Sequence, residues 1–333
     1  MLTSADWLEV LAPRLTEPLF DPQAVERLYR LARTLPGECQ GTLETRLAPG
    51  AQTVDLSLRL RMAQDARGVG VALPSSTRDF LAGWAEPEGP LAPVRSVWLE
   101  FDLDRDEPEP VVCAKLPRVQ DPGWLTGPLL RALQGHPIPG GQLDLILACL
   151  QALPETATLL YVFNLQARGS DAVRLEIFGL ESAGLLGYLR IVAPKVVSTV
   201  EPIVSLFEGV ERLHLSFDVV DEILPRIGIE GSFSRQPSRE PRWNAFLERL
   251  VAGDLCSPAK RDALLAWPGY DTFWTAPLHW PAELGPRGAC IRLVSHLKVV
   301  CRPDRDPEAK AYLVFGPPDR SSAAPASRST LST

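Results

Sequence analysis

The sequence predicts an α+β fold in which ten antiparallel strands close into a barrel around a polar lumen, with a ring of helices outside. Three observations predict this fold. Strand-like runs come in pairs joined by short turns, helical segments separate the pairs, and apolar and polar residues alternate along the runs. The unit helix–strand–strand occurs five times in 333 residues. Strands joined by such short turns pair antiparallel, because parallel neighbours need a long crossover connection.

The paired runs are recognised by alternation on both sides of a turn. In the first pair, TLETRL and TVDLSLRLRM flank the turn APGAQ. The five pairs span 42–47 and 53–62, 94–103 and 110–116, 158–166 and 172–180, 210–219 and 225–233, and 291–302 and 309–316.

Helical periodicity appears before the first pair and between successive pairs. SADWLEVLAPRL and DPQAVERLYRLARTL come first, and Ser4 and Asp21 are their predicted N-caps, since a short polar side chain there can accept a backbone N–H bond. The remaining helical segments span 76–86, 123–135, 141–153, 181–192, 194–209, 240–253 and 257–269.

Alternation also predicts which way each strand faces. In the run 53–62, the apolar residues Val54, Leu56, Leu58, Leu60 and Met62 alternate with Thr53, Asp55, Ser57, Arg59 and Arg61. The apolar side should pack against helices, so the polar side faces either bulk water or a wet cavity.

Two architectures satisfy this pattern. An open ten-stranded sheet would leave its polar side in water and two edges to protect. A closed barrel has no edges, and ten strands are slightly more than the eight whose side chains just fill the interior. We favour the barrel, whose lumen then has room for a ligand.

Composition describes a globular protein with a substantial core, at 45% hydrophobic and 23% charged residues. No apolar run is long enough for a membrane span, and MLTSADWLEV lacks the features of a signal peptide. The net charge of −7 argues against bulk nucleic-acid binding. Six scattered cysteines without a CxxC pair are expected to be small core residues in a reducing cytoplasm. Residues 317–333 are a low-complexity tail expected to be disordered, which leaves 1–316 as a single domain.

Each of the five repeats supplies at least one basic residue on the polar face. These residues are Arg59, Arg61, Lys115, Arg174, Arg226, Lys298 and Lys310. In a closed barrel they would converge and repel one another unless an anion neutralised them, and their N–H groups suit the oxygens of a diphosphate. Tyr312 could add a hydroxyl donor. The alternative is that these cations pair with Asp55, Glu100, Glu176 and Glu230 on the same face.

Aromatic residues share this face. They are Trp98, Phe178 and Tyr312, with Tyr161 or Phe163 depending on register. Aromatic ring faces stabilise positive charge, so such a wall suits chemistry that passes through a carbocation. His214 and His296 are also predicted on the polar side, where an acid/base role or a structural hydrogen bond is expected.

Five such units with a cation-bearing interior resemble the ABBA (PT-barrel) prenyltransferases, which act on indoles, phenols and peptides. "LETRL" at 43–47 resembles the first barrel strand of that family, and "HLKVV" and "AKAYLVF" resemble its Lys- and Tyr-bearing strands. The resemblance implies a lumen that holds an aromatic acceptor and an isoprenoid diphosphate. It places Glu44 at the acceptor and Lys298, Lys310 and Tyr312 at the diphosphate.

The resemblance further implies a cytoplasmic, monomeric transferase of secondary metabolism, with no nucleic-acid or membrane partner. The basic set would bind the diphosphate, and Glu44 or Glu100 would polarise the acceptor and take its proton. The acceptor and prenyl pocket would comprise Trp98, Tyr161, Phe178, His214, Glu230 and His296. No cofactor is required and no residue is assigned to a metal, so magnesium, if any, arrives with the diphosphate.

Three alternatives stay open, because the second strands "RLEIF" and "RIGIE" place Glu176 and Glu230 where the family has cations, and the chain has only five tyrosines. The barrel could use carboxylates such as Glu100 for acid/base hydrolysis or cyclisation. It could bind a small molecule or peptide without prenyl transfer. The chain could also be a structural α+β domain with an open sheet.

Overall fold

The computed structural model describes residues 2–51, 53–69, 73–105, 107–118 and 121–318. The predicted tail, 317–333, falls almost wholly outside these residues. No helix in the described part of the chain is long and apolar enough to cross a membrane.

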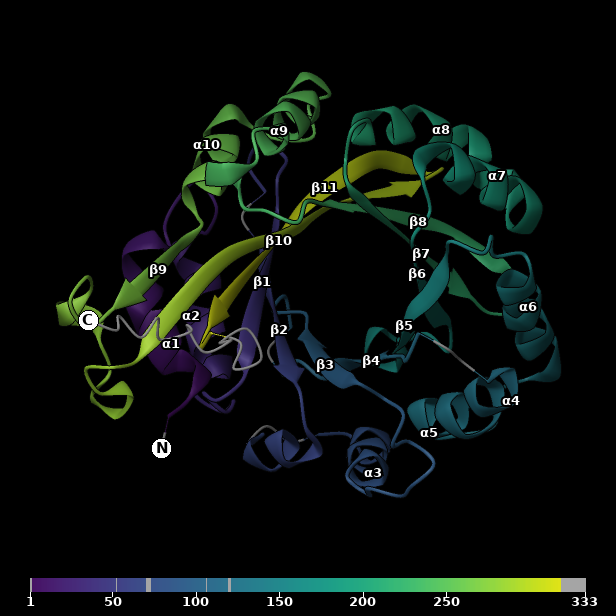
Figure 1. The fold of residues 1–333 in the computed structure, drawn as a ribbon, viewed down its shortest axis with the longest axis horizontal. Coiled ribbons are helices and arrows are strands. Elements are labelled where there is room, and N and C mark those ends of the chain that lie inside the picture. The colour runs from purple at the N-terminus through teal and green to yellow at the C-terminus, as the bar shows by residue number, and fades with distance from the viewer. Residues whose placement is uncertain (1, 52, 70–72, 106, 119–120, 319–333) are drawn as a thin grey trace, which may run out of the picture.

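Eleven strands form one antiparallel sheet within the described ranges. They are β1 (Gln40–Arg46), β2 (Val54–Leu60), β3 (Ser96–Phe101), β4 (Pro110–Lys115), β5 (Thr158–Asn164), β6 (Val173–Phe178), β7 (Arg212–Val219), β8 (Ile223–Ser232), β9 (Gly269–Thr272), β10 (Ala289–Arg302) and β11 (Arg305–Gly316). The sheet runs β11-β1-β2-β3-β4-β5-β6-β7-β8-β10-β9, and a further pairing of β10 with β11 closes it. Ten strands therefore form a closed barrel, which confirms the predicted fold class (Figure 1).

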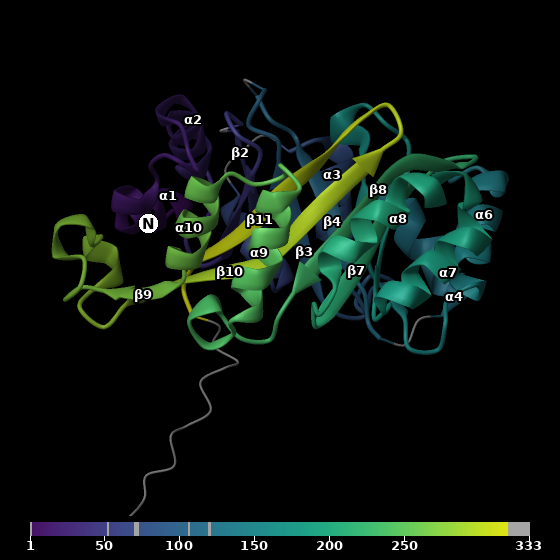
Figure 2. The ribbon, with the colours of Figure 1, turned by 90° about the horizontal axis from the view of Figure 1, so that it is seen from above.

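The helices lie on the outside of the ring (Figure 1). They are α1 (Ser4–Leu11), α2 (Pro22–Ala32), α3 (Ser75–Trp84), α4 (Pro122–Trp124), α5 (Leu130–Gln134), α6 (Gly140–Gln151), α7 (Ser182–Val192), α8 (Val197–Val204), α9 (Arg242–Ala252) and α10 (Pro258–Ala266). Seen from the side, they cover the strands along the wall of the barrel (Figure 2). The polar strand faces are thereby left to the interior.

The alternation of β2 confirms this division. Leu56, Leu58 and Leu60 have no exposed surface and belong to the main core, which lies between the strands and the helical coat. Asp55 and Ser57, which alternate with these leucines along the strand, line the lumen. Burying the apolar row stabilises the barrel by about 25 cal/mol for each Å² removed from water.

One N-cap was predicted correctly and one was not. Asp21 caps α2, because its Oδ1 accepts hydrogen bonds from the N–H groups of Gln23 and Ala24 at 2.8 and 2.9 Å. The N-cap of α1 is Thr3 rather than Ser4. The carboxylate of Asp6 accepts the Thr3 N–H at 2.6 Å, and this contact sets the helix start one residue earlier.

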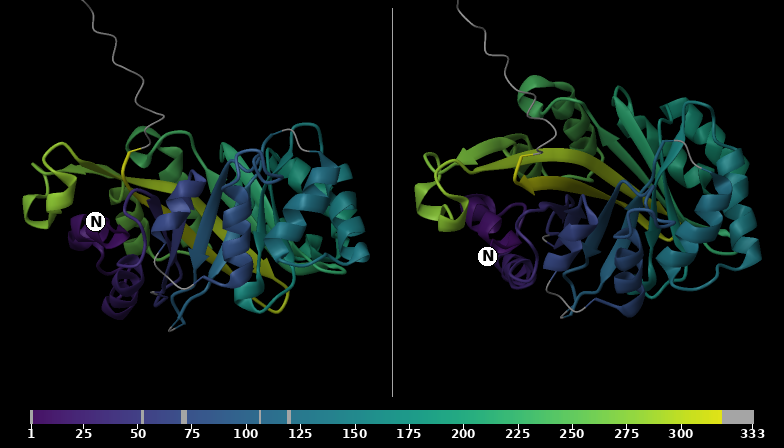
Figure 3. Two further views of the ribbon diagram at one scale, coloured as in Figure 1. Left: turned by 90° about the horizontal axis from the view of Figure 1, so that it is seen from below. Right: turned by 60° about the horizontal axis from the view of Figure 1, so that its bottom comes forward.

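Strand β9 was not predicted, because four residues are too few to show alternation. Residues 267–269 were instead assigned to the end of a helix, whereas α10 ends at Ala266. β9 pairs with the first residues of β10, from Ala289 to Arg292, outside the ring. The segment that follows it projects from the barrel and exposes Trp274 (78%) and Leu278 (92%) (Figure 3).

Lys260 on α10 holds the turn between β1 and β2. It is 2% exposed, and its ammonium donates to the backbone carbonyls of Arg46 at 2.8 Å, Ala48 at 3.0 Å and Ala51. A turn that would otherwise leave buried carbonyls unpaired is thus fixed beside the mouth of the lumen.

We expect Lys260→Met to lower the free energy of unfolding by about 1–3 kcal/mol, because it keeps the stem but leaves three half-buried backbone carbonyls without this donor. Urea denaturation followed by tryptophan fluorescence measures the effect. Lys195→Met is the control, because the Lys195 side chain is 91% exposed and its ammonium lies 3.9 Å from Glu222. Equal losses in the two variants would show that the turn does not depend on Lys260.

Candidate functional site in the barrel lumen

The lumen is a half-open cavity of about 640 Å³. Of the residues that the sequence assigned to a site, twelve line it: Glu44, Trp98, Glu100, Tyr161, Arg174, His214, Arg226, Glu230, His296, Lys298, Lys310 and Tyr312. Phe163 lines it as well as Tyr161, because residues two apart on β5 share a face. The predicted convergence of polar strand faces on one interior is therefore observed.

Four predicted site residues do not line the cavity, namely Arg59, Arg61, Lys115 and Phe178. They lie at the end of the barrel where the helices connect, at or next to strand ends. There the guanidinium of Arg59 lies 5.8 Å from the Trp98 ring centroid, and the Lys115 ammonium lies 5.7 Å from that of Tyr161. The rings, rather than these cations, form the wall.

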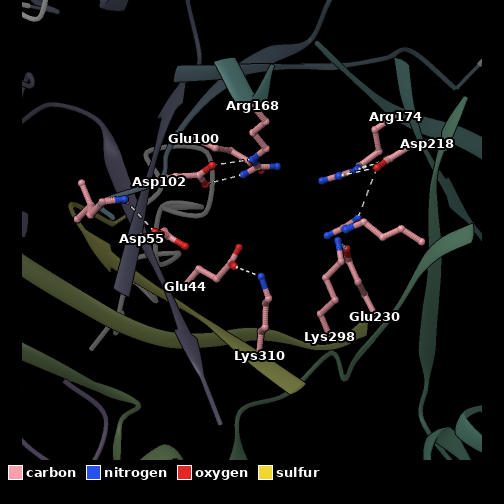
Figure 4. Close-up of polar contacts among 12 residues, drawn as sticks. Glu44, Asp55, Glu100, Asp102, Arg168, Arg174, Asp218, Glu230, Lys298 and Lys310 are labelled. Atoms are coloured by element: carbon pink, nitrogen blue, oxygen red, sulfur yellow. Dashed lines mark hydrogen bonds and ion pairs between the residues drawn. The ribbon is translucent and has the colours of Figure 1, made fainter. Parts of the chain in front are cut away.

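Most lumen cations are paired with carboxylates, the alternative that the sequence left open. Lys298 donates to Glu230 at 2.6 Å, and Lys310 donates to Glu44 at 2.7 Å (Figure 4). Each pair joins neighbouring strands. Glu230 on β8 lies opposite Lys298 on β10, and Glu44 and Lys310 lie on the paired strands β1 and β11. Gly228 makes room for the first pair, because a Cβ there would meet Cε of Lys298 at 2.6 Å.

Two bidentate arginine pairs lie toward the hairpin-turn end of the barrel (Figure 4). Arg174 binds Asp218 at 2.6 and 3.0 Å, and Arg168 binds Asp102 through two contacts of 2.8 Å. Arg168 also reaches Glu100 at 3.5 Å. Sequence reasoning missed Arg168 as a lumen residue, because it comes from a hairpin turn, where strand periodicity carries no signal.

The formal charges that line the cavity balance. The acidic residues are Glu44, Asp55, Glu100, Asp102, Asp104, Glu176, Glu230 and Glu308, and the basic ones are Arg46, Arg168, Arg174, Arg212, Arg226, Lys298, Arg302 and Lys310. The lumen as a whole therefore has no surplus of positive charge, and any anion has to bind at a local excess.

Such an excess surrounds Arg226. Its Nη1 is buried, makes no hydrogen bond within the described residues, and lies 4.0 Å from Asp218, which Arg174 already occupies. Burial, together with the charges of Arg174 and Arg302, lowers the pKa of Arg226 to about 10. Arg226 thus shares one carboxylate with Arg174, which already binds it through two hydrogen bonds.

Glu44 stays ionised in the lumen wall. Burial alone would raise its pKa, but the charges of Lys310 and Arg46 outweigh this and hold the pKa of Glu44 well below its usual range. The opposite holds for Glu100, where burial dominates and Arg168 compensates only in part, so its pKa is raised. Two lumen carboxylates therefore differ in basicity because their cationic neighbours differ.

Two histidines flank Glu230 in opposite environments. His214 Nδ1 lies 2.7 Å from Glu176, and this contact raises the pKa of His214 even though burial alone would lower it. His296 Nε2 lies 3.4 Å from Glu230, and its ring stacks on Tyr312 at a centroid distance of 4.0 Å. Burial dominates there and lowers the pKa of His296 to about 4.

One cluster of His and Glu side chains among the described residues has the spacing that a metal ion requires. Glu176, His214 and Glu230 place one ligand atom each within 4.8 Å of one another. Lys298 already pairs with Glu230, and Glu176 with His214, so the two carboxylates have basic partners without a metal.

An apolar wall completes the lumen. Cys113 and Phe163 form a small separate apolar cluster, against which Trp98 and Tyr161 pack. All four line the cavity. Cys113 is one of six free, buried cysteines, which agrees with the predicted core role of this residue type.

Solved structures share this barrel. AnaPT from Neosartorya fischeri aligns with a TM-score of 0.54 and 10% identity, over 93% of this chain and 91% of that chain. The apo form of the prenyltransferase PriB aligns with a TM-score of 0.52 and 15% identity, over 96% of this chain and 99% of that chain. The chain has the fold of the ABBA prenyltransferases.

A complex of PriB with its product diphosphate aligns equally well with the ABBA barrel described here, with a TM-score of 0.52 and 14% identity over 96% of this chain and 99% of that one. No protein-family model matches the chain, and no curated protein matches it by sequence. At these identities the shared ABBA fold is established, and activity has to be argued from the lumen.

The pKa of His296 predicts how stability depends on pH. Because the folded-state value is about 4 and the ordinary value is 6.5, the unfolded chain binds the extra proton between these values, and stability falls as the pH falls through this window. Glu230, His214, Lys298, Tyr312 and Glu44 face this imidazole.

When the pH falls from about 7 to about 5, the free energy of unfolding should fall by about 2 kcal/mol less in His296→Gln than in the wild type. Urea denaturation at both pH values measures this difference. His279→Gln replaces an exposed histidine outside the lumen and should follow the wild type. Parallel losses in all three proteins would contradict the assigned burial of His296.

Proposed function

We propose that the protein transfers an isoprenoid group from a prenyl diphosphate to an aromatic acceptor inside the lumen. The observation that carries this proposal is the buried Nη1 of Arg226, which makes no hydrogen bond within the described residues and lies near Arg174 and Arg302 in the wall of the lumen. A cavity with a local cationic excess and an apolar wall suits a substrate that has an anionic head and an apolar tail. The shared barrel fold supports the same proposal.

The diphosphate would bind at Arg226 and Arg302, beside the Arg174–Asp218 pair. Guanidiniums offer several N–H donors in a planar fork, and a diphosphate would neutralise charges that Asp218 alone does not. Lys298 and Lys310 would contribute less, because each would first have to leave a carboxylate at 2.6–2.7 Å. We therefore assign these two lysines mainly to holding Glu230 and Glu44.

The isoprenoid tail would lie against Trp98, Tyr161 and Phe163. As the C–O bond breaks, its electron pair leaves with the diphosphate, and the positive charge remains on the allyl carbons. Aromatic ring faces stabilise that charge, and the apolar wall limits the access of water on that side. The arginine group would stabilise the negative charge that develops on the leaving oxygen.

Glu44 would orient the acceptor. Its low pKa keeps it a carboxylate, which accepts a hydrogen bond from an indole N–H or a phenol O–H and makes the ring more nucleophilic. The ring then attacks the allyl cation, and loss of the proton from the attacked carbon restores aromaticity.

The charge balance of the lumen supports a second candidate, binding or acid/base chemistry without prenyl transfer. Lys298, Lys310 and Arg174 already have carboxylate partners and do not need a ligand anion. Stabilisation by an uncharged aromatic compound, with no response to diphosphates, would favour this candidate over prenyl transfer.

We expect inorganic pyrophosphate and dimethylallyl thiolodiphosphate to raise Tm, because binding to the folded state alone stabilises by about 1.4 kcal/mol at tenfold excess over Kd. Arg226→Met should weaken the affinity for both about tenfold to a hundredfold, through loss of charge-assisted hydrogen bonds. Isothermal titration calorimetry measures this. Arg190→Met, a change on the outer helix α7, is the control. Unchanged affinity in Arg226→Met would rule out the assigned diphosphate site.

We expect dimethylallyl diphosphate with indole, phenol or tryptophan to yield a product that is one isoprenoid unit heavier by mass spectrometry. Glu44→Gln should lower kcat about tenfold to a hundredfold, because a neutral amide polarises the acceptor less. Its affinity for dimethylallyl thiolodiphosphate should stay within about twofold, since the donor site lies elsewhere and Lys310 retains Glu308 at 3.3 Å. Equal losses of donor binding and turnover would argue against an acceptor role.

A further inference from the structure

A bulge in β10 brings two consecutive side chains into the lumen. The register of β10 against β11 shifts between Val294 and His296. In a regular strand, Ser295 and His296 would face opposite sides, yet both line the cavity. Bulges re-aim side chains and are common beside active sites. Alternation in the sequence does not reveal this, so Ser295 was not predicted as a site residue.

The re-aimed pair forms a row with Glu230. The Oγ of Ser295 lies 3.1 Å from Nδ1 of His296, and Nε2 of His296 lies 3.4 Å from a carboxylate oxygen of Glu230. Glu230 is 3% exposed and is held by Lys298 on its other oxygen at 2.6 Å. Hydroxyl, imidazole and carboxylate thus lie in order, with the imidazole stacked on Tyr312.

These contacts assign the tautomer of the neutral imidazole. A carboxylate opposite Nε2 favours a proton on that nitrogen, because a bare lone pair there would face negative charge. Nδ1 is then the basic atom and accepts a hydrogen bond from the Ser295 hydroxyl. A carboxylate that orients a histidine so that its basic nitrogen faces a hydroxyl is the arrangement of a general base.

We propose that Ser295 and His296, oriented by Glu230, take the proton that the acceptor ring loses after prenylation. This inference rests on the proposed function. It separates two tasks that the sequence assigned together to Glu44 or Glu100, namely polarising the acceptor and collecting its proton.

Glu44 is poorly suited to the second task. Its Oε1 already accepts a hydrogen bond from Lys310 at 2.7 Å and lies 3.5 Å from Arg46, whereas Nδ1 of the neutral His296 presents its lone pair to the Ser295 hydroxyl. The carbon of the prenylated, non-aromatic ring cation is a strong acid, so a weakly basic imidazole suffices to deprotonate it.

In the deprotonation step, the C–H bond of the attacked ring carbon breaks, and its electron pair restores the aromatic ring. The proton passes to Oγ of Ser295 while the hydroxyl proton moves to Nδ1 of His296, which becomes an imidazolium beside the Glu230 carboxylate. The imidazolium then returns the proton by the same hydroxyl to the departing diphosphate, and the site is restored.

The test compares ring-deuterated and ordinary indole, phenol and tryptophan with dimethylallyl diphosphate. In the wild type, deprotonation is fast, and deuterium should leave kcat unchanged. In His296→Gln and Ser295→Ala, kcat should fall about tenfold to a hundredfold and a primary isotope effect should appear, because C–H cleavage becomes slow. His279→Gln should behave as the wild type. KM should change little, and a general loss of folding would lower kcat without producing an isotope effect.

The outcomes separate this inference from the proposed function. Product formation with no isotope effect in His296→Gln overturns the inference and leaves prenyl transfer intact. A ¹⁵N NMR spectrum of the folded wild type that shows His296 protonated on Nδ1 rather than Nε2 overturns it without any turnover. Absence of product with all three acceptors in the wild type overturns prenyl transfer to these ring classes, and with it this proton path, even if NMR confirms the tautomer.

Discussion

Charges enclosed in the lumen have to be neutralised within the barrel, and this requirement governs the rest of the structure. A buried carboxylate or ammonium without a partner costs several kcal/mol, so ten strands with polar inner faces fold only if their charges meet. The pairs Glu230–Lys298 and Glu44–Lys310 join neighbouring strands and meet this requirement. The pairing therefore favours one register at the seam of the barrel.

The groups that are incompletely matched stand out against this background. Arg226 has a buried nitrogen with no hydrogen bond in the described chain, and His296 is held beside a carboxylate that already has an ammonium partner. These departures from full pairing lie where the wall has room for a ligand. The ion pairs elsewhere in the lumen offset the cost of keeping these few incompletely paired side chains at the candidate site.

The sequence predicted the barrel because alternation is a property of each strand by itself. β2 and its neighbours show their two faces without any knowledge of the fold, and short turns imply antiparallel pairing. Partners contributed by turns could not be predicted in this way, as Arg168 shows. Ser295 was hidden because one extra residue in a strand reverses the faces, and Gly228 because its value lies in the space it leaves for Lys298. Arg59 and Lys115 lie at the helix end of the barrel, beyond the cavity, and alternation does not show how far along a strand the cavity extends.

The seam between β1 and β11 has a consequence for how the chain folds. Glu44 and Lys310, which meet there, are 266 residues apart. Closing so long a loop costs entropy that local hairpins do not pay, and contacts of this range slow folding. Until residues 305–316 arrive, β1 and β10 each expose a row of unpaired backbone groups that a second chain can use as a template. Misassembly during biosynthesis is therefore expected to begin at this seam, and slower synthesis at low temperature should raise the yield of correctly folded protein.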